Sequence, residues 1–397
     1  MRNIGTVVRG IRTPIIKEND DLKKIVVDSL LKAQEEAKFE FHDKDIVAIT
    51  EAVVGIATGN YVTVDGITKD IKAKFNTNHI GVLFPILSRN RFAVLLSAMA
   101  RAMDKITLQI SYPSDEVGND ILDRDRLKEY GMNPYSYVLT EDEYHEKFGD
   151  WKHIFTGVNM VDFYKELIEK EGCEAEIILA NDPKEILNHV SDVLVCDIHT
   201  RNETKEVLKK NSNGQIIGMD EILTSSVDGS GFNSKYGLLG SNRSTEERVK
   251  LFPEGGEDLV YGIQEELKKI TGKTIEVMIY GDGAFKDPVG KIWELADPVV
   301  SPAYTKGLEG SPNELKLKYI SDNKYSNLKG EELNEAIRKE IAQKDANLKG
   351  KIETQGTTPR RYTDLIGSLC DLTSGSGDKG TPVVFIQGYF DNYSVNE

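Results

Sequence analysis

The feature that most constrains the fold of this chain is an alternation of short apolar runs and amphipathic segments between about Asn78 and Asn211. The runs HIGVLFPIL, KITLQISYP, AEIILA and DVLVCDIH are typical of buried strands, whereas NRFAVLLSAMARAM, MVDFYKELIEKEG, PKEILNHV and RNETKEVLKKN have helical character. Strands separated by helices favour βαβ units and a mostly parallel sheet. The stretch contains no GxGxxG, so a dinucleotide-binding fingerprint is absent. We therefore predict a Rossmann-like α/β unit over residues 78–211.

The flanking parts, residues 1–77 and 212–397, are predicted to form a second part with α/β and α+β character. Asp20 and Asp21 stand where a helix N-cap belongs, ahead of the periodic LKKIVVDSLLKAQEEA. Residues Thr6 to Val8 are expected to be extended, and GIRTP is expected to be a loop because a residue before proline avoids helical geometry.

Further elements of the flanking parts follow from local patterns. The β-branched run from Asp45 to Ala57 is typical of one buried strand. DLVYGIQEELKKI predicts a helix, and IEVMIYGD and TPVVFIQGYF predict strands. The charged stretch from Ser321 to Asn347 predicts an exposed helix.

Charge and cysteine content limit the class of partner. The formal net charge is -15, and a surface of that sign repels phosphodiester backbones and anionic lipid, so we expect neither nucleic acid nor membrane as a partner. An anionic small-molecule substrate remains compatible with this net charge, because a few local Arg or Lys side chains or metal ions can outweigh the electrostatic field of the whole surface. The three cysteines have no CxxC spacing, and no run approaches the ~18 apolar residues of a membrane span. These features predict a cytoplasmic protein in a reducing compartment.

Two aspartates are candidate metal ligands. Asp282 follows the strand-like run Val277 to Tyr280 and is flanked by glycines. Ligands gather at the carboxyl ends of parallel strands, and a carboxylate suits a hard cation. An ordinary Asp-Gly turn fits the same residues. Asp228, in the Gly/Ser-rich segment TSSVDGSGFNSKYGLLGSN, could share a metal with Asp282 or lie in a plain surface loop.

Anion contacts have weaker signals. The loop SGSGDKG leads into the last predicted strand and suits either phosphate contact or a plain connection. Arg89, Arg91 and Arg201 open predicted helices, where they could bind an anion or simply be solvated.

Taken in order, these pieces resemble the coenzyme F420-0:L-glutamate ligase family, the F420-0 gamma-glutamyl ligases. GIRTPIIKENDDL resembles the opening motif of that family, and DKDIVAITEAVVGIATG resembles its first strand–loop motif. SVDGS resembles its Asp-x-Ser metal motif, IYGDG its Ile-Ser-Asp-Thr motif, and the tail from NLKGKIET to TPVVFIQG its C-terminal motif. The similarity covers roughly residues 4–70 and 215–390 and is interrupted by the central unit.

The resemblance implies a two-part α/β fold, a homodimer, and carboxylate–amine ligation through an acyl-phosphate. It implies GTP or ATP as co-substrate, Mg²⁺ or Mn²⁺ as cofactor, and L-glutamate and a carboxylate acceptor as substrates. Asp228 and Asp282 would be the metal ligands. The implied nucleotide-binding residues are Gly10, Ile11, Arg12, Thr13, Thr50, Gly377, Asp378 and Gly380.

Several family positions carry other residues here. The two family lysines fall on Ala52 and Ile56, the family threonine on Gly283, and a Glu or Gln metal ligand on Ser376. GSN at residues 240–242 competes with SVDGS for the Asp-x-Ser-Asn motif and would put Leu239 in place of the aspartate. Candidate replacement cations, by nearness to the matched motifs, are Lys286, Lys291, Arg360 and Arg361.

Three functional hypotheses follow. The first is a ligase that acts on F420-0 or on a different acceptor. The second is a non-catalytic binding protein that keeps the ligase fold. The third is an unrelated α/β enzyme whose site lies in residues 78–211.

Overall fold

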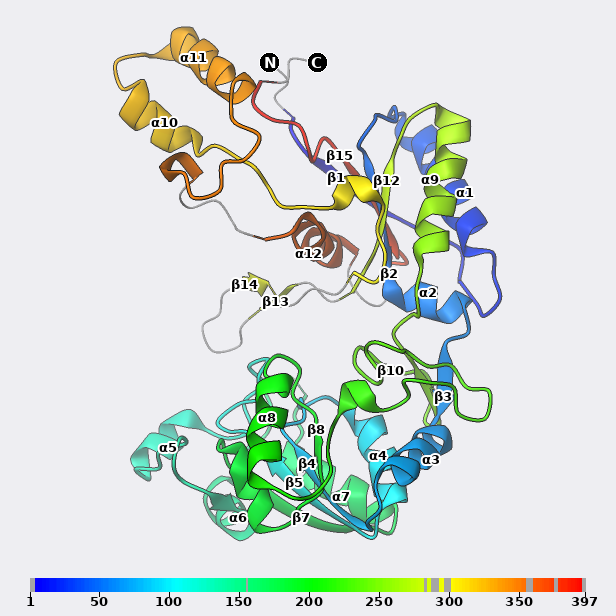
Figure 1. Ribbon diagram of the computed structural model, residues 1–397, viewed down its shortest axis with the longest axis vertical. Helices are drawn as coiled ribbons and strands as arrows, with labels where there is room; N and C mark the ends of the chain where they lie inside the picture. The colour runs from blue at the N-terminus through cyan, green and yellow to red at the C-terminus, as the bar shows by residue number, and fades with distance from the viewer. Residues whose placement is uncertain are drawn as a thin grey trace. The chain divides into compact units, whose positions relative to one another are not determined.

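Figure 1 shows the computed structural model, which describes residues 4–154, 156–281, 284–286, 293–295, 301–354, 360–374 and 378–394. The chain divides into two compact units. The terminal unit comprises Met1–Val54, Gly255–Ala284 and Leu295–Glu397, and the central unit comprises Gly55–Glu254 and Phe285–Glu294. Both units combine helices with sheets, which confirms the predicted α/β class.

The terminal unit is built on a four-stranded sheet in the order β1-β15-β2-β12. These strands are β1 (Val7–Ile11), β15 (Val383–Gln387), β2 (Ile46–Thr50) and β12 (Glu276–Tyr280). β15 runs antiparallel to both of its neighbours, whereas β2 and β12 are parallel. β1 therefore extends past the predicted Thr6–Val8, because Gly10 and Ile11 pair with Val384 and Val383 instead of lying in a loop.

Helices cover both faces of this sheet (Figure 1). α12 (Tyr362–Ser374) contacts all four strands, and its Ile366 and Cys370 are buried against Ala48, Met278 and Val384. On the other face, α1 (Leu22–Ala37) packs beside α9 (Glu257–Thr271). α1 begins as predicted, because the Asp21 side chain accepts a hydrogen bond from the Lys24 amide.

The charged stretch predicted as one helix forms two, α10 (Leu317–Lys324) and α11 (Gly330–Ala342). The helical run is interrupted between Lys324 and Gly330, and Gly330, at the start of α11, has a φ of 56°, which is outside the right-handed helical region. Their apolar sides meet in a small cluster that includes Ile320, Ile337 and Ile341. Short 3-10 turns, η3 (Lys306–Leu308) and η4 (Ile352–Thr354), complete this region. Elsewhere, β13 (Ala284–Lys286) pairs with β14 (Trp293–Leu295), and most residues of these two strands belong to the central unit.

The central unit contains a six-stranded sheet in the order β6-β7-β5-β4-β8-β9. Its strands are β4 (His79–Leu83), β5 (Lys105–Ile110), β6 (Leu139–Thr140), β7 (Glu174–Leu179), β8 (Val193–Val195) and β9 (Ile216–Gly218). Every pairing is parallel except β6 with β7, as the strand–helix alternation predicts. The chain proceeds from β4 outward to β5 and β7, then crosses to β8 and β9. The direction of winding thus reverses between β4 and β8.

Helices also enclose this sheet. α3 (Val64–Lys74), α4 (Phe92–Ala102) and α7 (Met160–Lys170) share the large core of one face, and α5 (Arg124–Glu129) and α6 (Glu141–Phe148) add to it. The opposite face is covered by α8 (Arg201–Asn211) and the 3-10 turn η1 (Pro183–Asn188). Alternate residues of β8 supply the two cores, since Leu194 joins the first and Val193 and Val195 join the second.

A small antiparallel sheet, β10-β11-β3, also belongs to the central unit; its strands are β10 (Asn242–Arg243), β11 (Arg248–Lys250) and β3 (Tyr61–Thr63). A further 3-10 turn, η2 (Met219–Glu221), follows β9. Contacts place α3 and β9 within this unit, which is therefore wider than the range 78–211 that the alternation indicates. Among the described residues, no helix has both the length and the apolar character needed to cross a membrane.

The run predicted as one strand from Asp45 to Ala57 changes structure halfway. β2 ends at Thr50, and α2 (Glu51–Ala57) follows at once. Glu51, Val54 and Ala57 are the buried side of this segment, and their spacing of three residues is helical. The strand prediction was wrong here because an apolar run of this length fits either structure.

Candidate functional site

One edge of the terminal-unit sheet gathers most of the residues that the resemblance assigns to nucleotide binding. Ile11 at the end of β1 lies opposite Val383 at the start of β15. Val383 in turn lies opposite Ile49, and Thr50 lies opposite Tyr280 at the end of β12. The chain segments that follow β1, β2 and β12 and the segment that precedes β15 therefore leave the sheet at the same edge.

Hydrogen bonds join three of these segments. The Thr13 amide donates to the Gly380 carbonyl at 3.2 Å, and the Thr50 amide donates to the Pro382 carbonyl at 3.0 Å. Arg12 Nε donates to the Lys379 carbonyl at 3.3 Å, and its side chain is exposed. We call this cluster the sheet-edge site; of the predicted nucleotide-binding residues it contains Gly10, Ile11, Arg12, Thr13, Thr50, Asp378 and Gly380. Gly377 lies outside the described residues.

Gly10 and Thr381 pack closely against each other in the sheet-edge site. A Cβ on Gly10 would lie 3.2 Å from Cβ of Thr381, so the two segments approach more closely than larger side chains would allow. The Thr381 hydroxyl donates to the Ser374 carbonyl at the end of α12. The Tyr280 side chain is 1% exposed, and burial raises the pKa of its hydroxyl, partly offset by Ser374 and Thr50. That hydroxyl has no well-aligned hydrogen-bond partner among the described residues.

The second candidate site surrounds Asp228 in the central unit. Asp228 has a φ of 51°, in the left-handed region, and its carboxylate accepts from Lys69 Nζ at 2.5 Å. This bond raises the pKa of Lys69. The pair borders a pocket of about 250 Å³, which we call the Asp228 pocket. Its lining residues are Tyr61, Val62, Thr63, Asp65, Gly66, Lys69, Val227, Asp228, Gly229, Ser230 and Arg248.

The Asp228 pocket has charges of both signs. The Arg248 guanidinium stacks over the Tyr61 ring at 3.9 Å from its centroid, and Lys69 is the second lining cation. The amino end of α3 borders the pocket, and Thr63 caps it by accepting from the Gly66 amide at 3.0 Å. Two cations near a helix amino end suit a phosphate or carboxylate group.

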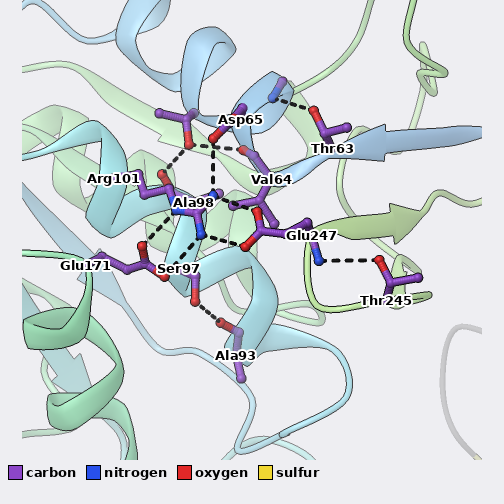
Figure 2. A network of polar contacts seen from close by, with 12 residues as sticks. Thr63, Val64, Asp65, Ala93, Ser97, Ala98, Arg101, Glu171, Thr245 and Glu247 are labelled. Atoms are coloured by element: carbon purple, nitrogen blue, oxygen red, sulfur yellow. Dashed lines mark hydrogen bonds and ion pairs between the residues drawn. The ribbon is translucent and has the colours of Figure 1, made fainter.

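A network of ion pairs positions one wall of this pocket (Figure 2). Arg101 donates to Glu247 at 2.7 and 2.8 Å, to Glu171 at 2.8 Å and to Asp65 at 3.1 Å. The hydrogen bonds from Glu247 and then Glu171 raise the pKa of Arg101, which stays charged. Asp65 lines the pocket and is paired with Arg101, so the positive charge of Arg101 offsets the negative charge that Asp65 brings to the pocket wall.

The described residues do not form a divalent metal site on their own. Hard cations bind several oxygen ligands, and no group of three His, Cys, Asp or Glu side chains in the described ranges could hold a metal. The Asp228 carboxylate already has an ammonium partner, and Asp282 lies outside those ranges. The pairing of Asp228 with Asp282 therefore stays a prediction.

Other residues singled out by the sequence have mixed placements. Gly283, Lys291 and Ser376 lie outside the described residues, and Lys286 lies in β13. Arg360 and Arg361 precede α12. Arg201 is engaged within the fold, because its Nε lies 2.9 Å from Asp220 and its Nη1 donates to the Asp197 and Ile198 carbonyls.

Lys69 and Arg248 were missed by sequence reasoning. Each sits in an ordinary helical or strand pattern, and nothing local marks it as functional. The Lys69–Asp228 contact joins residues 159 positions apart, so only the fold reveals it.

Comparison with known proteins adds one finding. A family model described as F420-0:Gamma-glutamyl ligase matches residues 10–388, a range that takes in residues of both units. No curated protein sequence matches the chain at a significant level.

Proposed function

The chain belongs to the F420-0:gamma-glutamyl ligase family, and from this premise we propose that it joins L-glutamate to a carboxylate acceptor, F420-0 or a related molecule, at the expense of GTP or ATP. In the proposed reaction the acceptor carboxylate attacks the γ-phosphoryl group, which gives an acyl-phosphate and a nucleoside diphosphate. The glutamate amine then attacks the acyl carbon, phosphate leaves, and the amine loses a proton as the amide forms.

The observation that carries this proposal is the sheet-edge site. Residues from opposite ends of the chain, Arg12 and Thr13 on one side and Lys379 and Gly380 on the other, are hydrogen-bonded there. The turn at Gly380 has a φ of 65°, which suits a residue without a side chain, and the exposed Arg12 guanidinium is hydrogen-bonded to the adjacent Lys379 carbonyl. Phosphoryl transfer depends mainly on positioning and on neutralising charge, which such backbone and cationic groups supply.

Divalent-ion dependence is part of the proposal. A bound Mg²⁺ or Mn²⁺ would supply charge neutralisation for the triphosphate. Asp282 and Asp228 are its proposed ligands, and Asp228 would have to exchange the Lys69 ammonium for the ion. We also propose that the active form is a homodimer.

The test is a product assay combined with nucleotide titration. Purified protein is incubated with GTP or ATP, Mg²⁺ or Mn²⁺, L-glutamate and F420-0, and the glutamylated product is followed by mass spectrometry. Arg12→Ala is expected to weaken nucleotide binding by about tenfold, because a charge-assisted contact is lost. Lys32→Ala, which removes an exposed cation from α1 of the same unit, should leave binding unchanged. Equal effects of both substitutions would argue against the sheet-edge site.

One observation favours a second candidate, a non-catalytic binding protein. α2 carries Ala52 and Ile56 where the family resemblance places lysines, so no cation comes from that helix. Nucleotide binding without product, for F420-0 and for related acceptors, would select this candidate. Absence of binding to either nucleotide would remove both.

A further inference from the structure

Two hydroxyl side chains end neighbouring strands of the terminal-unit sheet. Thr50 is the last residue of β2, Tyr280 is the last residue of β12, and the parallel pairing places them opposite each other. Two residues earlier, Ala48 and Met278 are also opposite each other and pack against α12. Side chains two residues apart along a strand point to the same face. Thr50 and Tyr280 therefore lie side by side on the face that α12 covers, at the edge that forms the sheet-edge site.

The two hydroxyls differ in access to solvent. The Tyr280 side chain is 1% exposed, and its hydroxyl has no well-aligned hydrogen-bond partner among the described residues. Thr50, in contrast, is only partly buried. A ligand in the sheet-edge site can therefore reach Thr50, whereas Tyr280 lies behind it in the protein interior.

The surroundings of Tyr280 keep its hydroxyl protonated. Burial is the largest cause that raises its pKa, and Cys370 and Asp371 raise the pKa further. Ser374 and Thr50 are the two hydroxyl neighbours that lower this pKa. At neutral pH the phenol is thus a hydrogen-bond donor, with Thr50 and Ser374 as its nearby acceptors.

The stability of the free protein does not explain this hydroxyl. A buried hydroxyl without a well-formed hydrogen bond is unfavourable, and a phenylalanine ring would fill the same space without that cost. A hydroxyl group has one proton to donate and two lone pairs to accept. When Thr50 donates its proton to an anionic ligand, its oxygen keeps lone pairs for a second donor, and Tyr280 is the buried donor next to it.

We propose that Tyr280 is a positioning residue for the nucleotide: its hydroxyl donates to Thr50, and the Thr50 hydroxyl donates to a phosphate oxygen. Consecutive hydrogen bonds polarise one another, so the buried phenol strengthens a contact that it does not make itself. No proton is transferred, and both hydroxyls stay neutral. This inference rests on the proposed ligase function and deepens it, because it gives Thr50 a direct role and Tyr280 an indirect one.

The test is a double-substitution cycle on the full chain. Calorimetric titration with GTP and with ATP is done in the presence of Mg²⁺, without glutamate or acceptor, so that binding is measured and not turnover. Thr50→Val, which removes the hydroxyl and keeps the branched shape, is expected to weaken binding about tenfold, and Tyr280→Phe about fourfold. The double variant should stay about tenfold weaker than wild type, whereas independent effects would give about fortyfold.

Two further substitutions identify the acceptor. Thr50→Ser keeps a hydroxyl at this position, so Tyr280→Phe should again weaken binding about fourfold in that background. Ser374→Ala removes the other neighbouring hydroxyl and should leave the effect of Tyr280→Phe unchanged. If Thr50→Val does not fold, Thr50→Ala completes the same cycle.

Urea unfolding separates positioning from a structural role. Tyr280→Phe should leave the unfolding midpoint unchanged or raise it, because a hydroxyl without a well-formed hydrogen bond is removed. Tyr144→Phe is the matched control. Tyr144 is also fully buried, but its hydroxyl donates to the Ile121 carbonyl at 3.1 Å in the central unit. Loss of that bond should lower the midpoint and leave nucleotide affinity unchanged.

The outcomes distinguish this inference from the ligase proposal. If wild type binds nucleotide and Tyr280→Phe binds it equally well, the positioning role is overturned and the ligase proposal stands. Additive losses in the double variant would show that Tyr280 acts without Thr50 and would overturn the inference as well. Failure of the wild type to bind either nucleotide would remove the ligase proposal, and this inference with it.

Discussion

At the scale of single residues, we expect the Lys69–Asp228 ion pair to matter more for ligand binding than for the stability of the fold. Their side chains are 68% and 64% exposed, and ion pairs that water reaches so freely contribute little to folding. The pair nevertheless borders the Asp228 pocket, where a ligand or an ion that replaced one partner would meet the charge of the other. Loss of either charge should therefore change ligand affinity while the fold remains intact.

Asp228→Asn is expected to leave the midpoint of urea unfolding unchanged and to weaken Mg²⁺-dependent GTP binding by about tenfold or more. Calorimetric titration with and without Mg²⁺ measures this. Asp28→Asn is the control, because it breaks another exposed pair, Lys24–Asp28 at 3.0 Å, on α1. A similar loss of affinity in both variants would mean that Asp228 has no special role.

Glu116 carries a pH-dependent contribution to stability. Its carboxylate accepts from the Ile198 amide at 2.5 Å and from the His199 amide at 3.0 Å, and burial raises its pKa to about 7. The folded chain thus keeps this proton up to about pH 7, whereas the unfolded chain releases it near 4.5. The free energy of unfolding therefore falls as pH rises from about 4.5 to 7. Burial raises the pKa of Asp115 and of Asp197 nearby, which adds to the same trend.

Glu116→Gln should flatten this dependence by up to about 3 kcal/mol across that range, at ~1.4 kcal/mol per pKa unit. Urea unfolding of both proteins at intervals between pH 5 and 8 gives the two slopes. Glu129→Gln, at an exposed position on α5, should keep the wild-type slope. Parallel curves for wild type and Glu116→Gln would contradict the assignment.

At the scale of elements, local patterns predicted those segments whose own residues decide their structure. α1 is confirmed from its cap to its end because Asp21 and the apolar spacing act within the helix. The sheet of the central unit was predicted as parallel because buried strands alternate with helices. The helix α2 was missed because its apolar residues fit a strand equally well. The sheet-edge site was suggested by the family resemblance, but the Thr13–Gly380 contact depends on pairing between distant strands.

Gly81 shows how tightly one element packs on another. A Cβ at this position of β4 would lie 2.5 Å from Cδ1 of Ile186 in η1. Gly81→Ala is therefore expected to destabilise the fold by about 1–3 kcal/mol through overpacking. Adding Ile186→Val, which removes the overlapping methyl group, should restore part of the loss. Chemical unfolding of the single and double variants measures both, and strictly additive losses would show that the two side chains do not compete.

At the scale of the whole molecule, the family resemblance inferred from five separated motifs is confirmed by the match over residues 10–388. The extent of the central unit could not be taken from the alternation alone. α3 precedes β4, the first strand of the six-stranded sheet, and packs on α4, and β9 follows the last predicted helix and pairs with β8. Such boundaries are determined by tertiary contacts, which leave no local signal.

A fragment of residues 55–254 is expected to fold on its own, because the apolar cores of both faces of its sheet lie within that range. A shorter fragment of residues 78–211 lacks α3 and β9 and should unfold without cooperativity. Thermal melts followed by circular dichroism compare the two. A cooperative transition of equal midpoint in the shorter fragment would show that α3 and β9 are dispensable.

The pairing of β1 with β15 has a consequence for biosynthesis. Val7 lies opposite Gln387, so β1 leaves the ribosome before the central unit, whereas its partner β15 leaves after it. The central unit is nearly continuous in sequence and can complete its sheet while translation is still under way. The sheet-edge site, which needs both strands, forms only after β15 has emerged. A nascent chain therefore carries a finished central unit for a period in which the proposed nucleotide site does not yet exist.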